Sequence, residues 1–168
     1  ITTVEHALMM LGTSPFFAHF GDLPAVESTL AGQPLALAGL MQVVCRAHHA
    51  ALYAHDWASL RNDRMADEVA MAALLHDLAE MLLWCFASEM PLRIAAMLQS
   101  DGSLRSSAAQ ARVIGFKFAD LQTSLIARWR LAALLQSMMD DAHATRPQAM
   151  NVGLAVNLAR HSAGGWDN

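Results

Sequence analysis

At 168 residues the chain is long enough for one domain, which would bury roughly two-thirds of the surface that its unfolded form exposes. The apolar share of 55% and the charged share of 15% are typical of a helical protein with much buried surface, or of one that covers part of its exterior with a partner. A net charge of −4, with ten arginines and one lysine scattered singly, argues against a basic nucleic-acid-binding surface.

The first third of the sequence predicts short helices followed by a long one. A capping box at Thr2–Glu5 opens the first helix, which Gly12 closes. Ser14-Pro15 starts a second short helix that reaches Phe20, and a third begins near Pro24 and runs toward Leu30. From Pro34, apolar residues at helical spacing predict a long amphipathic helix with His48, His49 and His55.

The rest of the sequence predicts further helices separated by polar or glycine-containing turns. Asp63 is the expected N-cap of a central helix, and Ser88 of the next one, which runs from Pro91 to about Gln99. Four more helices are expected at Ser103–Ile114, Phe118–Trp129, Ala132–Ala142 and Pro147–His161. Because no segment alternates with period two over strand length, the predicted class is all-α.

The central stretch Ala70–Phe86 is apolar at fourteen of seventeen positions, so we expect one helix surrounded by other helices. Its polar side chains are His76, Asp77 and Glu80. A buried carboxylate costs several kcal/mol of desolvation unless it is paired, hydrogen-bonded or bound to a metal. The pair His76-Asp77 is therefore either part of a site or a satisfied core pair.

Cys45 and Cys85 stand in apolar helical patterns without metal-type spacing, so both are expected to be buried thiols in a reducing compartment. Trp84 and Trp129 are likewise expected in the core. The longest uninterrupted apolar stretches have seven residues, against about twenty for a membrane span, so no membrane association is expected. The chain starts with Ile and is expected to be a piece of a longer protein.

A family resemblance follows from the order of these motifs. The sequence RAHH places Arg46 and His49 on the long helix, and His49 lies 27 residues before His76 in the sequence LLHD. This arrangement resembles the HD superfamily of metal-dependent phosphohydrolases and, within it, the HD-related output domain, HDOD, a bacterial signalling module. Further similar stretches are Val4–Gly12, Gly115–Lys117, Trp129–Ala132 and Val156–Ala159.

The resemblance implies a single-domain multi-helix bundle of the HD-domain type over residues 1–168, with the family's early helices absent or lying before residue 1. Residues 164–168 are expected to form a tail or the start of a linker. The resemblance also implies which residues stand at the metal-ligand positions of active relatives: His49, His76, Asp77 and His143.

Other ligand positions of the family hold Lys117, Ala142 and Asn157 here, so the resemblance implies a metal site that is only vestigial. Losing ligands should weaken metal binding by more than the 10–100-fold typical of changes around the ligands. We expect the Lys117 ammonium to pair with Asp77 in the place of a cation.

Two functions follow as hypotheses from the resemblance. The first is a non-catalytic bacterial signal-transduction module that binds another protein, or another domain of its own chain, with no cofactor and with homo-oligomerisation left open. The second is a cytoplasmic metal-dependent phosphohydrolase acting on a nucleotide or cyclic dinucleotide, with Fe, Mn, Zn or Mg held by Asp77 and histidines. The cytoplasm is the expected location for both.

Overall fold

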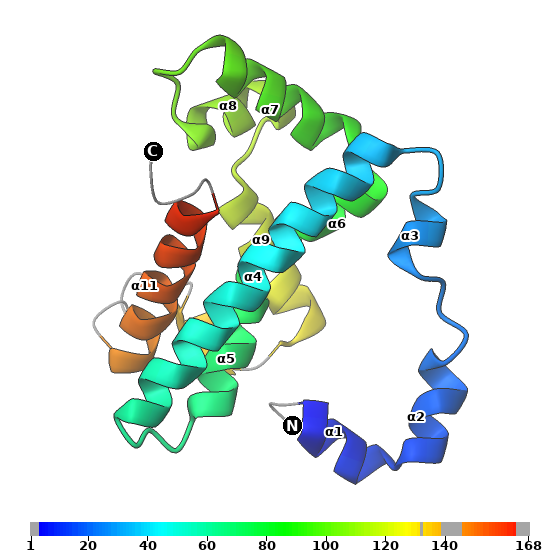
Figure 1. The fold of residues 1–168 in the computed structure, drawn as a ribbon, viewed down its shortest axis with the longest axis vertical. Helices are drawn as coiled ribbons and strands as arrows, with labels where there is room; N and C mark the ends of the chain where they lie inside the picture. Colours follow the sequence, from blue (N-terminus) through cyan, green and yellow to red (C-terminus); the bar gives the residue numbers. More distant parts are fainter. Residues whose placement is uncertain (1–3, 132, 139–145, 164–168) are drawn as a thin grey trace.

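A computed structural model describes residues 4–131, 133–138 and 146–163 of the chain (Figure 1). All regular structure in these residues is helical, which confirms the predicted all-α class. The helices are α1 (Val4–Leu11), α2 (Thr13–Phe20), α3 (Val26–Thr29), α4 (Pro34–Leu60), α5 (Ala66–Leu74), α6 (Leu78–Phe86), α7 (Glu89–Ser100), α8 (Ser106–Ile114), α9 (Phe118–Trp129), α10 (Ala133–Met138) and α11 (Pro147–Ser162).

Helix α4 is the long axis around which the bundle packs, with α5, α6 and α11 against it (Figure 1). Its buried face consists largely of small residues, which let neighbouring backbones approach closely. These residues are Ala36, Gly39, Ala47, Ala50, Ala54 and Ala58. One end of α4 packs on α5 and α11 through Val69 and Val152, and the other end packs on Trp84 of α6.

The predicted central helix Ala70–Phe86 is wrong in one respect, because the structure divides it into α5 and α6. Leu75, His76 and Asp77 form the turn between them, and Asp77 becomes the N-cap residue of α6. The side-chain amide of Gln122 on α9 bonds the backbone on both sides of the break. Its Oε1 accepts a hydrogen bond from the Ala79 N–H at 2.7 Å, and its Nε2 donates to the Leu75 carbonyl at 2.7 Å.

The first three helices lie along one side of the bundle (Figure 1). None of residues 5–29 is buried, and Leu30 is the first core residue that follows them. We call residues 5–29 the N-terminal arm. Large apolar side chains of this arm are exposed: Met9, Met10, Leu11, Phe17, Phe20, Leu23 and Val26.

Three further local predictions differ from the structure. The N-cap of α5 is Met65 rather than Asp63, which lies two residues before Met65 and whose Oδ1 accepts the Met65 N–H at 3.0 Å. Cys45 is exposed on α4, and Cys85 is only partly buried, although it packs against the core cluster around Trp84. Trp84 is buried as predicted, but Trp129 is 49% exposed at the end of α9.

Two stretches of the described chain meet the length and hydropathy of a membrane-spanning helix. They are Pro34–Leu60, with a mean hydropathy of 1.2, and Ala66–Phe86, with 1.6. A mean hydropathy tolerates single polar residues, whereas a count of uninterrupted apolar residues does not. Core helices of soluble proteins meet the same criterion, so these values are only weak evidence for a membrane span. The expectation of no membrane association stays a prediction.

Candidate functional site

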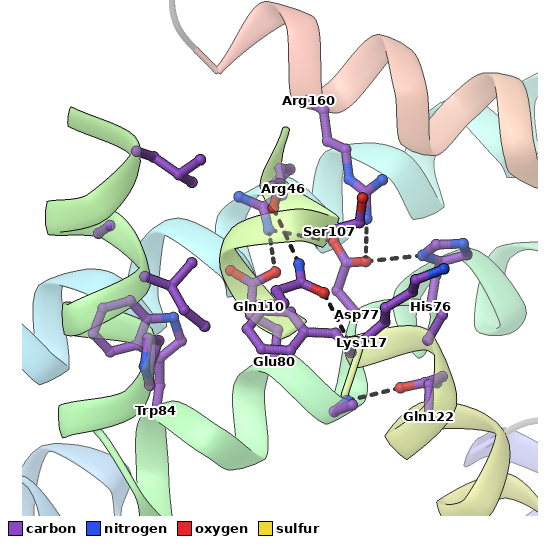
Figure 2. A pocket seen from close by; sticks show the side chains of 18 of the residues that line it. Arg46, His76, Asp77, Glu80, Trp84, Ser107, Gln110, Lys117, Gln122 and Arg160 are labelled. Carbon is purple, nitrogen blue, oxygen red and sulfur yellow. Dashed lines mark hydrogen bonds and ion pairs between the residues drawn. The ribbon is translucent and has the colours of Figure 1, made fainter. Parts of the chain in front are cut away.

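The break between α5 and α6 places the Asp77 carboxylate between two other helices. Arg46 projects from α4 and Arg160 from α11, and both reach toward Asp77 (Figure 2). Asp77 is 8% exposed, so it needs partners to remain ionised. Arg46 lies 31 residues before Asp77 in the sequence, and Arg160 lies 83 residues after it.

Three side chains donate to the two oxygens of Asp77. Arg160 Nη2 donates to Oδ1 at 2.7 Å, and Arg46 Nη2 donates to Oδ2 at 3.3 Å. The ring Nδ1 of His76 lies 2.8 Å from Oδ1. Because an ionised carboxylate only accepts hydrogen bonds, this contact requires the proton on Nδ1.

These contacts decide the protonation of Asp77. Burial alone would raise its pKa, but the hydrogen bond from His76 and the positive charges of Arg160 and Arg46 outweigh burial. The pKa of Asp77 is therefore held well below its ordinary value of 3.8. Asp77 is a carboxylate anion throughout the physiological pH range.

Glu80 shares Arg46 with Asp77, one turn further along α6. Arg46 Nη2 donates to Glu80 Oε2 at 3.0 Å. Burial raises the pKa of Glu80, the charge of Arg46 opposes this, and the neighbouring Asp77 adds to it. The Nε of Arg46 is buried without an acceptor in the described residues, so the guanidinium is only partly satisfied by the two carboxylates.

A pocket of about 620 Å³ opens beside this charged group (Figure 2). Its volume lies within the range of about 300–1,000 Å³ that is usual for sites of small organic ligands. Residues of α4, α6, α7, α8, α9 and α11 line it. The lining includes Arg46, Asp77, Glu80, Lys117 and Arg160 on one side and Trp84, Pro91, Ile94, Leu98 and Phe118 among its apolar members.

The model of the HDOD domain family matches residues 1–145, most of the chain. The chain belongs to the HDOD family. Comparison with curated proteins and with solved structures finds no match. Arg160 on α11 lies beyond the residues that the HDOD model matches, although its guanidinium is bonded to the Asp77 of the HD pair.

The structure brings together two of the four predicted metal ligands of this HDOD chain. His76 and Asp77 are adjacent and bonded. His49 is exposed on α4, where its ring stacks on Tyr53 with centroids 6.5 Å apart, and it does not line the pocket. His143 lies outside the described residues, so the vestigial four-residue set stays a prediction.

The described residues around Asp77 do not fit a divalent cation. No three of their His, Cys, Asp and Glu side chains are grouped as metal ligands in the described ranges. Both oxygens of Asp77 already accept hydrogen bonds, two of them from guanidinium groups. A cation at Asp77 would lie close to two fixed positive charges, and the Coulomb repulsion is large at such distances.

The prediction that Lys117 pairs with Asp77 is wrong. Lys117 lines the same pocket, but among the described side chains Asp77 forms its ion pairs with Arg46, His76 and Arg160. The sequence did indicate that Arg46 could lie near the site, because it stands one helical turn before His49 in the motif that resembles the family. Nothing local indicates Arg160 or Gln122, because their partners are 83 and 43 residues away.

Proposed function

We propose that this HDOD chain is a non-catalytic signal-transduction module that acts by binding another protein or another domain of its own chain. Family membership suggests a signalling or output role. The observation that supports the non-catalytic part is the pairing of Asp77 with Arg46 and Arg160, because these guanidinium groups already bond the carboxylate oxygens that a metal ion would need as ligands.

The exposed apolar side chains of the N-terminal arm support a role in binding proteins. Contiguous apolar surface is uncommon on monomeric proteins and often marks an interface. Met10 and Phe17 are 76% and 66% exposed on consecutive helices of the arm. Their contact with a partner would remove this surface from water.

A hydrolysis assay tests the proposal against the phosphohydrolase hypothesis. The purified chain is incubated with Mn²⁺ and with nucleotides and cyclic dinucleotides, beside a His76→Ala variant. We expect no turnover above the buffer blank in either protein, and no metal retained in elemental analysis. Hydrolysis at enzyme-like rates that His76→Ala abolishes would contradict the proposal and favour the hydrolase.

A further inference from the structure

The pocket beside Asp77 has one charged side and one apolar side. The charged side comes from α4, α6, α11 and the residue before α9, and the apolar side comes mainly from α6 and α7. Trp84, Ile94 and Leu98 lie on the apolar side. A molecule that fits both sides needs a polar head and an apolar body.

The charged side has an excess of positive charge. Arg46, Lys117 and Arg160 contribute three cations against the two carboxylates of Asp77 and Glu80. Lys117 forms no ion pair within the described part of the chain, and Arg160 is 46% exposed with only its Nη2 bonded to Asp77. The N–H groups of these two side chains that have no acceptor can donate hydrogen bonds to an anionic head group.

Trp84 adds a further polar group to the lining. Its side chain is 8% exposed and lines the pocket. The buried indole N–H faces Glu80 and lowers the pKa of that carboxyl group, but it makes no hydrogen bond of full geometry with any described residue, so it can take a further acceptor. Buried indole N–H groups usually find an acceptor. Gly39 of α4 leaves room for the ring, since a Cβ there would lie 2.6 Å from the ring atom Cζ3.

The start of α8 completes the polar part of the lining. Ser106 and Ser107 are the first two residues of this nine-residue helix, and both line the pocket. The first N–H groups of a helix have no acceptor within the helix and favour a negative charge. Together with Lys117 and Arg160, they add donors for an anion.

We infer that this pocket binds a small organic anion that has one phosphate or carboxylate head group and an apolar body. The head group lies toward Lys117 and Arg160, and the body lies against Trp84 and the apolar face of α7. This inference goes beyond the proposed function, because binding is measured on the chain alone and does not depend on a protein partner or on hydrolysis.

Fluorine NMR of the chain labelled with 5-fluorotryptophan tests the inference. The Trp84 resonance is assigned with Trp84→Phe and followed during titration with phenyl phosphate and with benzoate, which separate the two kinds of head group. Inorganic phosphate and benzyl alcohol supply the head without the body and the body without the head. We expect a saturable shift of the Trp84 resonance with at least one of the two anions, and much weaker binding of the two fragments.

Variants identify the charged side of the site. Lys117→Gln, at an exposed residue, should raise the dissociation constant of the binding anion about tenfold through the loss of one charged hydrogen bond. Arg128→Gln, at an exposed arginine outside the pocket, is the matched control and should leave it unchanged. The inference is overturned if neither anion shifts Trp84 saturably, if benzyl alcohol binds as tightly, or if Lys117→Gln binds like the wild type.

Discussion

Asp77 accepts hydrogen bonds from side chains that three different parts of the chain provide. Replacing a buried ion pair by well-packed apolar residues is often neutral, but removing one partner leaves the others with uncompensated charge. The exposed fractions differ strongly here, at 8% for Asp77, 19% for Arg46 and 46% for Arg160. Arg160 can therefore be solvated when Asp77 is changed, whereas Arg46 cannot be solvated fully.

Asp77→Asn should lower the free energy of unfolding at neutral pH by about 3 kcal/mol, because the charge that holds Arg46 and Arg160 is removed. Urea unfolding followed by circular dichroism measures the difference. Asp22→Asn, at an exposed residue of the N-terminal arm, is the control and should change it by less than about 0.5 kcal/mol.

The stabilisation by Asp77 should also depend on pH. Its pKa is lower in the folded chain than its ordinary value of 3.8, so the unfolded chain binds a proton first as the pH falls. The stability difference between the wild type and Asp77→Asn should be full above pH 3.8 and should decrease as the pH falls further. A difference that increases toward acidic pH would contradict the assigned ionisation.

At the scale of the elements, the break between α5 and α6 depends on Gln122 from a third helix. Gln122 is 2% exposed and bonds one backbone group on each side of the break. Without it, the buried Ala79 N–H loses its acceptor, which costs about 1–3 kcal/mol, whereas the Leu75 carbonyl keeps the Leu78 N–H at 3.2 Å as a donor.

Gln122→Leu keeps a similar size but removes both hydrogen bonds and leaves the Ala79 N–H without an acceptor, so we expect a loss of about 1–3 kcal/mol in the free energy of unfolding. Gln99→Leu, at an exposed position of α7, is the matched control and should change little. Unchanged stability together with higher helicity in circular dichroism would mean that α5 and α6 can join into one helix, and would contradict the role assigned to Gln122.

Replacing each of two helical glycines by alanine distinguishes the effect of close packing on stability from the effect of helix propensity. A methyl group at Gly39 of α4 would overlap the rigid ring of Trp84, while one at Gly153 of α11 would meet nothing within 4 Å. Gly39→Ala should destabilise the chain by about 1–3 kcal/mol through overpacking. Gly153→Ala should stabilise it by up to about 1 kcal/mol through helix propensity. Thermal unfolding measures both, and a stabilising Gly39→Ala would contradict the observed packing of α4 on α6.

At the scale of the whole molecule, the bundle and the N-terminal arm differ in burial. The core begins at Leu30, and every described residue with burial information before it is at least partly exposed. Burial of apolar area supplies most of the folding free energy, so the arm adds little to the stability of the bundle. Its large apolar side chains remain exposed, and they are the surface that the proposed partner would cover.

The double change Met10→Ser with Phe17→Ser should therefore alter the free energy of unfolding by less than about 0.5 kcal/mol. Leu40→Ala, in the core of α4, is the comparison and should cost about 2–5 kcal/mol. Sedimentation velocity on the same proteins measures self-association, which the double change should reduce if copies of the chain meet through the arm. A core-like loss of stability would show that the arm packs onto the bundle.

The sequence by itself determined the all-α class, the family and most of the helices, but not the break between α5 and α6. Apolar residues at helical spacing, prolines at N1 and the glycine after α8 placed α4, α9 and α11 close to their observed bounds, since these signals act within a few residues. Helix α2 starts at Thr13 with Gly12 as its N-cap, so the expected start at Ser14-Pro15 is wrong. The pair His76-Asp77, with His49 upstream and the further similar stretches in family-like order, indicated the relationship to HDOD domains, which the family match confirms.

Only the tertiary structure decided what surrounds that pair. The turn at residues 75–77 depends on the Gln122 amide, and the charge balance of Asp77 depends on Arg46 and Arg160, which lie 31 and 83 residues away. Local propensity favours one continuous helix there, and hydrogen bonds to distant side chains override it. The exposure of Cys45 and Trp129 likewise depends on which helix faces are covered, which helical spacing alone does not specify.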